Sequence, residues 1–552
     1  MLQYTVYKQK GARGMLNKNV LLCAVNSQYI HSNPAVWSLK KAATAYGERY
    51  GIQLPDIQIQ EYTINEPYDR VLCDILSRKP DLLCFSVYIW NVARIGALLA
   101  DIRRVIPETT IVLGGPEVSF GNIPIQRDLY DHVITGEGER KFFTFLLNWL
   151  NLPVPDALQQ EGLLPGADIP FIYTEENLPY FRNRIVYYES TRGCPFSCAY
   201  CLSGKHDPVR AKPLEQVYGE LQFLIDHDVP QVKFVDRTFN CIPDRCEAIL
   251  QYLLDHAKAG MNFHFECAGD LFTEAQLALI GKAPKGLFQF EIGIQSTCEE
   301  TLKLACRKTS IDQVFRNIRK LMAPGNANIH VDLIAGLPGE DYHRFKQSFN
   351  DVYTLQAHQL QLGFLKILKG APLERMQEAY GYVFSANPPY EILRNACLPN
   401  GEILEMKGIE DVLNRYYNSG RYPKTLEYLI ALYKSPWDFY QGLAAWFRGK
   451  GLLGQGISAK NASEELLAYG VSVFPEAEER ISYLLLEDFY GVDPSDVVPP
   501  SLRKYHVVSS VTRKMVEDCP PGMTIRAVED TFYQVNYGEK DVVTGRYALK
   551  PC

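Results

Sequence analysis

The sequence predicts an α/β protein in three parts: a doubly wound domain with a parallel sheet, a partial barrel of six β/α units, and a mainly helical C-terminal domain. Two series of short apolar runs alternate with amphipathic segments, which is the pattern of parallel strands covered by helices on both faces. A stretch rich in proline and glycine, 151–183, is typical of a linker between them. The alternation ends near residue 385, where aromatic residues at helical spacing take over.

Residues 19–150 make up the doubly wound domain, after an N-terminal tail of residues 1–18. The run NVLLCAV (19–25) predicts a buried strand, and PAVWSLKKAATAYGERYG (34–51) predicts the helix that follows it. Further strands are expected at 57–63, 81–88, 109–116 and the start of 131–150, and further helices at 68–80, 91–107 and the end of 131–150. A ligand of such a domain binds outside the carboxyl ends of the strands.

Residues 184–385 hold the second series, for which we expect a partial, TIM-like (β/α)6 barrel. The predicted strands are 184–190, 231–236, 262–268, 287–293, 328–335 and 358–365. The predicted helices are 213–227, 243–259, 273–281, 299–305, 311–323 and 341–356. The first of these strands runs directly into a loop with three cysteines.

Residues 386–552 are expected to form a mainly helical accessory domain. Aromatic residues recur at helical spacing in WDFYQGLAAWF (437–447), which is more typical of a helical core than of a binding site. The end of the chain predicts short strands around a turn at Tyr537–Glu539.

The composition limits the classes of function. The 552-residue chain has a net charge of -7, so it offers no overall basic surface for nucleic acid. It contains no run of 18 apolar residues, and its first segment lacks the apolar core of a signal peptide. Nothing beside the 14 cysteines indicates secretion. We therefore expect a cytoplasmic protein that has neither a membrane nor a nucleic acid as its partner.

The cysteine loop places Cys194, Cys198 and Cys201 at C-x3-C-x2-C spacing. Zinc is one reading, but structural zinc sites usually take four ligands in two separated pairs, and no second pair follows. A four-iron four-sulfur cluster favours thiolate ligands, and three cysteines leave one iron open. An open position makes a metal site catalytic rather than structural, so we favour the cluster over zinc.

With Tyr200 directly before the third cysteine, this loop resembles that of the radical S-adenosylmethionine (SAM) enzymes. The resemblance implies that the open iron chelates SAM, whose reductive cleavage yields a 5′-deoxyadenosyl radical. It also implies SAM contacts at successive strand ends, for each of which an ordinary polar residue at the barrel mouth is the alternative. These are Asp236 at the amino group, Glu266 at the ribose or methionine part, Gln295 with Ser296 on the next strand, and Gly336 against the adenine.

A doubly wound domain ahead of this barrel resembles the cobalamin-binding arrangement of one branch of the family. Ser86 and the pair Gly114–Gly115 match the serine and double glycine around the nucleotide tail of base-off cobalamin, and Glu137 stands at a helix start suited to polar ligand groups. The family's D-x-H-x-x-G motif is missing. His31 lacks the aspartate, the spacing and the glycine, so we expect a loop residue or substrate contact rather than a cobalt ligand.

The whole resemblance is to an uncharacterised subgroup of cobalamin-type radical SAM proteins with an extra C-terminal domain, from anaerobic and facultative bacteria. It implies a methyltransferase-like radical SAM enzyme that uses a cluster, SAM and cobalamin to methylate or rearrange an unknown substrate. A flavodoxin or ferredoxin is the implied reductant. The alternatives are a radical SAM enzyme without cobalamin and a non-catalytic sensor that binds cobalamin or a cluster. A methylthiotransferase is disfavoured because Cys23, Cys73 and Cys84 lie inside predicted helices and strands.

Overall fold

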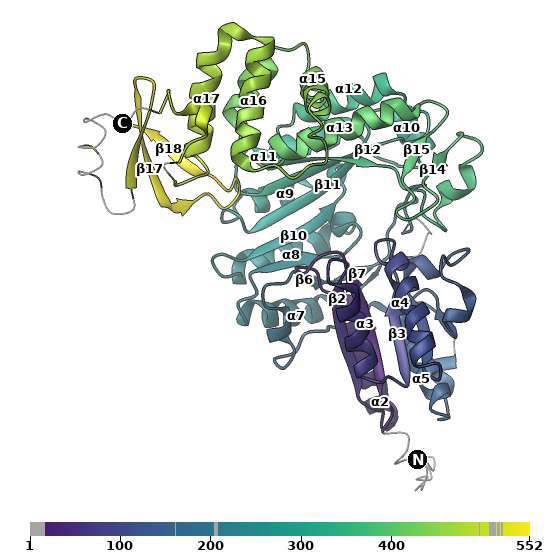
Figure 1. The fold of residues 1–552 in the computed structure, drawn as a ribbon. Coiled ribbons are helices and arrows are strands. Elements are labelled where there is room, and N and C mark those ends of the chain that lie inside the picture. Colours follow the sequence, from purple (N-terminus) through teal and green to yellow (C-terminus); the bar gives the residue numbers. More distant parts are fainter. Residues whose placement is uncertain are drawn as a thin grey trace.

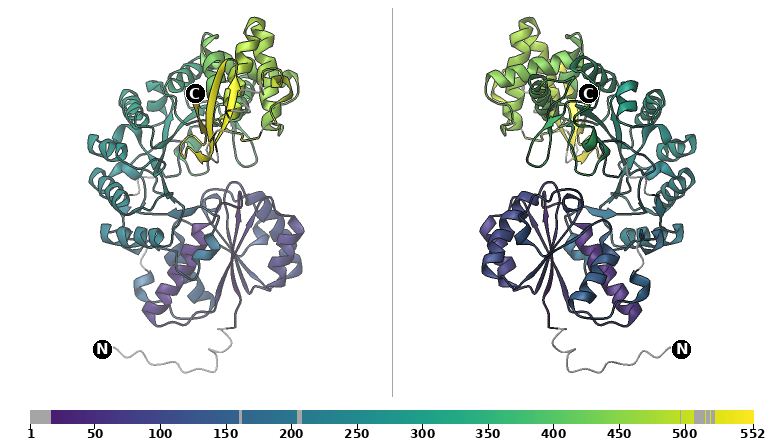
Figure 2. Two further views of the ribbon diagram at one scale, coloured as in Figure 1. Left: turned by 90° about the vertical axis from the view of Figure 1, so that its left-hand side faces the viewer. Right: turned by 90° about the vertical axis from the view of Figure 1, so that its right-hand side faces the viewer.

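A computed structural model describes residues 17–159, 162–203, 208–495, 497–506, 515, 519 and 523–552. It confirms the predicted fold class, with an N-terminal parallel sheet, an open barrel and a mainly helical C-terminal region (Figure 1). Figure 2 shows the barrel as an arc, with the N-terminal domain against one end and the C-terminal region against the other. No helix in these ranges is long and apolar enough to cross a membrane.

The N-terminal domain is a five-stranded parallel sheet with the order β2-β1-β3-β4-β5. Its strands are β1 (Val20–Asn26), β2 (Ile57–Thr63), β3 (Leu82–Ser86), β4 (Thr110–Gly114) and β5 (His132–Ile134). Its helices are α2 (Pro34–Tyr50), α3 (Tyr68–Ser77), α4 (Val92–Val105) and α5 (Gly138–Trp149). The strand order reverses between β1 and β3, which is where domains of this type bind ligands.

Strand β1 is apolar throughout because both faces of the sheet are covered. Leu21, Cys23 and Val25 belong to the core under α3 and α4, whereas the alternate residues Val20 and Leu22 belong to the core under α2 and α5. Successive side chains of a strand point to opposite faces, so a strand buried on both sides shows a continuous apolar run.

The barrel sheet is parallel and has six strands in the order β13-β12-β11-β10-β9-β6. These are β6 (Val186–Tyr188), β9 (Gln231–Phe234), β10 (Asn262–Cys267), β11 (Phe288–Gln295), β12 (Asn328–Ala335) and β13 (Gln359–Phe364). The helices on its outer side are α7 (Leu214–Asp226), α8 (Pro243–His256), α9 (Glu274–Gly281), α10 (Glu299–Leu304), α11 (Ile311–Met322) and α12 (Tyr342–Tyr353). Strands β6 and β13 are the edges, so the barrel is open between them.

The barrel strands separate apolar from polar side chains. In β11, Phe288, Phe290 and Ile292 are buried, whereas Glu291 and Gln295 point to the opposite, concave face. This alternation with a period of two places the apolar face under the outer helices and a polar face inside the arc. The described residues of the linker 151–183 form short helices: α6 (Asp156–Gln159), η3 (Gly166–Asp168) and η4 (Leu178–Phe181).

The C-terminal region begins with the hairpin of β14 (Val383–Phe384) and β15 (Ile392–Arg394). The α-helices that follow in the described residues are α13 (Asn400–Tyr416), α14 (Pro423–Ala431), α15 (Pro436–Gly449), α16 (Ala459–Val473) and α17 (Glu478–Tyr490). An antiparallel sheet of β16 (Met523–Val528), β17 (Thr531–Lys540) and β18 (Tyr547–Pro551) lies beside α17.

The predicted turn at Tyr537–Glu539 is wrong, because these residues lie inside β17. The chain reverses after Lys540 instead, where Asp541 Oδ1 accepts hydrogen bonds from the Val543 and Thr544 amides. The glycine that indicated a turn, Gly538, falls where the pairing of β17 with β18 changes register. Glycine is found both in turns and at irregularities inside strands, and the sequence alone does not distinguish these two structures.

Candidate cofactor site at the cysteine loop

The cysteine loop starts from a short two-stranded stem. Strand β7 (Thr191–Arg192) pairs antiparallel with β8 (Arg210–Ala211), so the two ends of the loop are held side by side. Cys194 and Cys198 are buried, Cys201 is half-buried, and all three thiols are free. The loop is therefore anchored at its base and carries three cysteines outside any disulfide on a short segment.

Cys198 and Cys201 each have a hydrogen-bond donor beside the sulfur. The donor-to-sulfur contacts are Arg307 Nη1 to Cys198 Sγ at 3.9 Å and the Ser203 amide to Cys201 Sγ at 3.4 Å. Cys194 Sγ lies 3.6 Å from Thr238 Oγ1, whose own proton is donated to the Arg237 carbonyl at 2.7 Å. A thiolate ligand is stabilised by hydrogen-bond donors, which also set the reduction potential of a cluster. Within the described ranges no three His, Cys, Asp or Glu side chains form a ready metal-ion site. The ligand set fits a cluster that the loop closes around on binding.

Asp236, predicted at the SAM amino group, holds the stem of this loop. It is fully buried, and its carboxylate accepts hydrogen bonds from the Ser190 amide at 2.7 Å, from the Ser190 hydroxyl and from the Thr191 hydroxyl at 2.8 Å. Burial raises the pKa of Asp236, while the hydrogen bonds from Ser190 and Thr191 oppose that shift. Asp236 does not line the cavity beside the loop.

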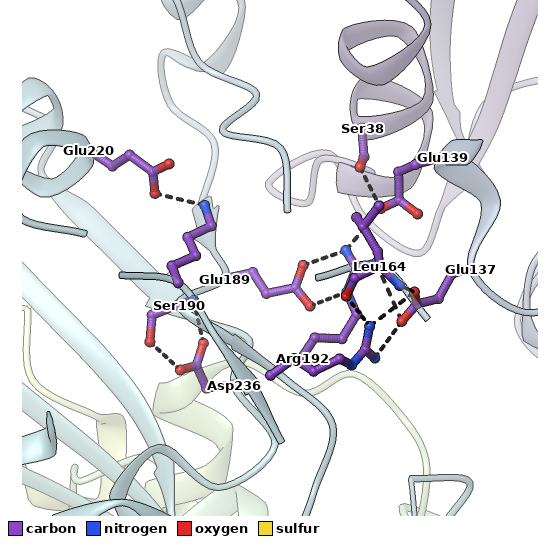
Figure 3. Close-up of polar contacts among 11 residues, drawn as sticks. Ser38, Glu137, Glu139, Leu164, Glu189, Ser190, Arg192, Glu220 and Asp236 are labelled. Carbon is purple, nitrogen blue, oxygen red and sulfur yellow. Dashed lines mark hydrogen bonds and ion pairs between the residues drawn. The ribbon is translucent and has the colours of Figure 1, made fainter. Parts of the chain in front are cut away.

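Two arginines of the stem bind carboxylates of the N-terminal domain (Figure 3). Arg192 Nη2 donates to Glu139 Oε1 at 2.9 Å, and Arg192 also pairs with Glu189 at 2.8 Å. Arg210 makes a bidentate pair with Glu137, whose Oε2 also accepts the Leu164 amide at 2.7 Å. Glu137, predicted as a cobalamin contact, therefore binds the linker and the cysteine-loop stem.

A cavity of about 150 Å³ opens beside the cysteine loop on the concave face of the barrel. Of the predicted SAM contacts, Glu266 and Gln295 line it. Gly336 does not line the cavity, and Ile392 lies 2.7 Å from the position that a Cβ at Gly336 would take. Sequence reasoning missed further lining residues: Arg237, Thr238, Glu291, Arg307 and Asp332. Glu291 could have been found from its alternation with buried residues along β11.

Two buried oxygen atoms in this cavity have no hydrogen-bond partner in the part of the chain that the structure describes: Gln295 Oε1 and Asp332 Oδ1. A buried polar atom without a partner is costly, so both atoms are suited to a ligand with several donors. Gln295 adopts φ +72°, and a Cβ at Gly293 would collide with the Gln295 amide. SAM, with an ammonium group and two ribose hydroxyls, supplies donors of this kind, so the cavity fits it.

The acids of the cavity are in different electrostatic environments. Burial, together with Glu291 and Glu266, raises the pKa of Asp332 to about 8. The His264 imidazole, 3.3 Å from Glu291 Oε2, together with Lys233 at 3.2 Å lowers the pKa of Glu291 to about 2. At neutral pH the cavity therefore holds a protonated Asp332 beside an ionised Glu291, so it presents both a donor and a charged acceptor.

The residues predicted around the cobalamin tail lie at the carboxyl edge of the N-terminal sheet. Ser86 ends β3 and accepts a hydrogen bond from Asn33 Nδ2 at 3.3 Å. Gly114 ends β4, and Gly115 adopts φ +107°, where an added Cβ would lie 2.5 Å from the Val87 carbonyl oxygen. The close contact between Gly115 and Val87 therefore explains why residue 115 is a glycine, without a contact to a ligand.

His31 joins the N-terminal domain to the barrel. Its Nδ1 lies 2.6 Å from the Tyr187 hydroxyl on β6, and burial lowers the pKa of His31. The Arg184 guanidinium, beside the same strand, donates to the His31 carbonyl at 3.2 Å. His31 thus lies in a loop at the interface of the two domains, as expected for a loop residue.

Three family models match the chain. The B12 binding domain matches residues 21–145, the Radical SAM superfamily matches 188–352, and the family "Protein of unknown function (DUF4080)" matches 378–517. The first two confirm the predicted set of cofactors, which is a [4Fe-4S] cluster, SAM and cobalamin.

Two curated relatives are similar to this chain. The 2-(S-pantetheinyl)-carbapenam-3-carboxylate methyltransferase of Streptantibioticus cattleyicolor is 24% identical over 360 residues, covering 58% of this chain and 52% of that protein. The cobalamin-dependent radical SAM methyltransferase TokK of Streptomyces tokunonensis is 24% identical over 372 residues, covering 59% and 52%. The chain thus spans about half the length of these relatives.

Two solved structures share the fold. The cobalamin-dependent radical enzyme OxsB, with aqua-cobalamin and SAM bound, has a TM-score of 0.57 at 15% identity, covering 88% of this chain and 83% of that one. The methyltransferase TsrM of Kitasatospora setae, with tryptophan and a SAM analogue, has a TM-score of 0.51 at 16% identity, covering 66% and 77%. The chain thus carries, in order, a B12 binding domain, a Radical SAM superfamily domain and a C-terminal DUF4080 domain.

Proposed function

We propose that this protein is a cobalamin-dependent radical SAM enzyme of the methyltransferase type. One observation carries the proposal: a loop with three free thiols lies beside a polar cavity in which Gln295 and Asp332 each leave a buried oxygen without a partner. When bound, the cluster, SAM and cobalamin supply the electron, the hydrogen-abstracting radical and the methyl group. The chain's own residues bind and orient them.

The protein contributes ligands and polar contacts. Cys194, Cys198 and Cys201 hold the cluster, and Arg307 donates to both Cys198 Sγ and, at 3.2 Å, the Tyr200 hydroxyl. Arg307 is therefore suited to balance the negative charge of the thiolates. Gln295, Asp332 and Glu266 line the cavity for the polar groups of SAM.

Cobalamin binds, in this proposal, at the carboxyl ends of β1, β3 and β4, near the reversal of strand order. Trp90 is 43% exposed there and stacks on Tyr88 at 4.4 Å between ring centroids. An exposed indole ring backed by a half-buried tyrosine ring is suited to a large flat ligand. Ser86 and Gly114 stand at the same edge.

A radical SAM enzyme without cobalamin is the second candidate. Its support is that Glu137 is already paired with Arg210 and that Gly115 is required by the contact with Val87. In that case the N-terminal domain positions the cysteine loop and the substrate.

The compartment and the reductant belong to the same proposal. All 14 cysteines are free, which is typical of a reducing compartment such as the cytoplasm. A cluster in that compartment is reduced by a small electron carrier, for which we propose a flavodoxin or a ferredoxin.

The test is anaerobic reconstitution with iron, sulfide and cobalamin, followed by assay of bound metal and of 5′-deoxyadenosine formed from SAM. We expect about four irons and about one cobalt per chain, with SAM cleavage after reduction. Iron and cleavage without cobalt would favour the second candidate. Absence of both iron and cleavage would refute the two proposals together.

A further inference from the structure

A second and larger cavity, of about 670 Å³, lies between the barrel edge β13 and helix α13 of the C-terminal region. Its volume is in the range of pockets that hold small ligands. Gln359 and Gln361 of β13 line one side, and Lys407, Glu410 and Asn414 of α13 line the other. The three α13 residues are three or four positions apart, so they lie along one face of that helix. The C-terminal region therefore completes a cavity that the barrel leaves open.

This cavity is next to the proposed cofactor site. Tyr200 of the cysteine loop lines it, and the Tyr200 hydroxyl accepts a hydrogen bond from Arg307, which lines the first cavity. On β12, Asp332 lines the first cavity and Ile334 lines the second. Two residues apart on one strand, these side chains share a face and are about 7 Å apart. A molecule in the second cavity would lie directly beside the cofactors.

Two lysines and two glutamates line the second cavity, and one lysine and one glutamate of these four form an ion pair with each other. Lys407 is paired with Glu391, so this pair is neutral overall. Lys366 is exposed, and the structure gives its ammonium group no partner in the described part of the chain. Burial raises the pKa of Glu410, whose carboxylate accepts a hydrogen bond from Asn414. One cation and one acid are thus available to a ligand.

Two side-chain amides of β13 are also available to bind a ligand. Neither Gln359 nor Gln361 has a side-chain hydrogen bond among the described residues, and both line the cavity. Each amide can donate and accept at the same time, which matches a carbonyl or an N–H group of a ligand. A polyanion is disfavoured, because the two lysines are offset by two glutamates and no excess positive charge is left.

We propose that this cavity is the substrate site, that the DUF4080 domain completes it, and that it takes a small zwitterion of the amino-acid or short-peptide class. Lys366 binds the carboxylate of the ligand and Glu410 binds its ammonium group. The side-chain amides of Gln359 and Gln361 bind the amide groups of a short peptide. The inference rests on the proposed radical SAM function, because the substrate of such an enzyme must lie beside the cofactors, and this cavity reaches Tyr200 of the cysteine loop and Ile334 of β12.

The first experiment measures ligand binding to the reconstituted full-length protein by calorimetry. The probes are the standard amino acids and a set of dipeptides, with ATP and a sugar phosphate as anionic probes. We expect saturable binding of at least one zwitterion and about tenfold weaker binding to Lys366→Met and to Glu410→Gln. Tighter binding of the anions, or no binding of any zwitterion at millimolar concentration, would overturn the assignment of substrate class.

The second experiment tests the location with a matched pair of substitutions on one helix. Asn414→Trp fills the cavity from α13, whereas Leu404→Trp adds the same side chain at a site on α13 that is 54% exposed and outside the cavity lining. We expect Asn414→Trp to abolish binding of the zwitterion and Leu404→Trp to leave binding and SAM cleavage as in the wild type. Unchanged binding to Asn414→Trp would exclude this cavity.

The proposed function is checked on the same preparations by iron content and by SAM cleavage without substrate. If the wild-type protein binds no iron and does not cleave SAM, the proposed function itself is refuted. Full iron and cleavage, with no zwitterion bound, would refute only the substrate class. The two failures are therefore distinguishable.

Discussion

Arg192, two residues before the first cysteine of the loop, donates a hydrogen bond at 2.9 Å to Glu139 in the first turn of α5, across the boundary between the N-terminal domain and the barrel. Burial of Glu139 opposes ionisation, but the charge and hydrogen bond of Arg192 outweigh it and lower the pKa of Glu139. The stem of the proposed cluster loop is thus held by a charge of the B12-binding domain.

Replacing Arg192 by Met should destabilise the protein and reduce the iron bound after reconstitution. The side chain of Glu139 is only 7% exposed, so loss of Arg192 leaves a buried carboxylate without a cation and with the Ser38 hydroxyl as a remaining donor, at a cost of about 3 kcal/mol. Denaturant unfolding, with iron content measured in parallel, checks this. As a control, Arg70→Met removes a pair whose arginine is 74% exposed and should cost less than about 1 kcal/mol. The paired variant Arg192→Met with Glu139→Gln should recover part of the loss, and no recovery would contradict the coupling.

Cys198→Ala should abolish cluster assembly and SAM cleavage, because two thiolates remain where three are needed. Cys397→Ala is the matched control, since Cys397 is exposed and lies outside the loop. The measurements are iron and sulfide content, the visible absorbance of the cluster and 5′-deoxyadenosine formation. Full SAM cleavage by the Cys198 variant would refute the role of the loop.

Local patterns were sufficient to predict most strands and helices of the N-terminal domain and the barrel. The strand β12 was predicted at 328–335, and the structure places it at Asn328–Ala335. Strand β11 was predicted to end at 293, but it continues to Gln295 through an irregularity in its pairing with β12. Such an irregularity depends on the neighbouring strand, and the alternation of one strand does not reveal it.

The site was predicted less completely, because its arrangement depends on partners far away in the sequence. Glu266 and Gln295 line the cavity, as residues at strand ends do in barrels. Asp236 and Glu137 also lie at a strand end and a helix start, but their carboxylates bind the stem of the cysteine loop. Arg210 is 73 positions from Glu137, and only the packing of two domains brings them together.

Gly293→Ala should weaken SAM binding without unfolding the barrel. The added Cβ would collide with the Gln295 amide, which must then leave its place in the cavity. Gly219→Ala is the matched control, because Gly219 is an exposed helical residue with open space around it, and alanine there should stabilise α7 by about 0.5–1 kcal/mol. Calorimetric titration with SAM compares the two. Equal SAM affinity in both variants would show that Gln295 does not contact SAM.

The free energy of unfolding should change with pH because Asp332 titrates. Its folded-state pKa of about 8 is raised by burial, by Glu291 and by Glu266, while Lys233 and Arg307 act in the opposite direction. Because the folded state holds this proton more tightly, the contribution of Asp332 to stability is full below the unfolded pKa of about 3.9 and is lost as the pH rises to about 8.

The Asp332→Asn variant removes this titration. Between about pH 6 and pH 8 we expect the wild type to lose stability relative to the variant, and above about pH 8 we expect the two curves to run parallel. Denaturant midpoints of the protein without cofactors, measured across this range, provide the comparison. A constant difference between the two proteins at all pH values would mean that Asp332 is already ionised in the folded state, and its proposed role as a hydrogen-bond donor in the cavity would then be wrong.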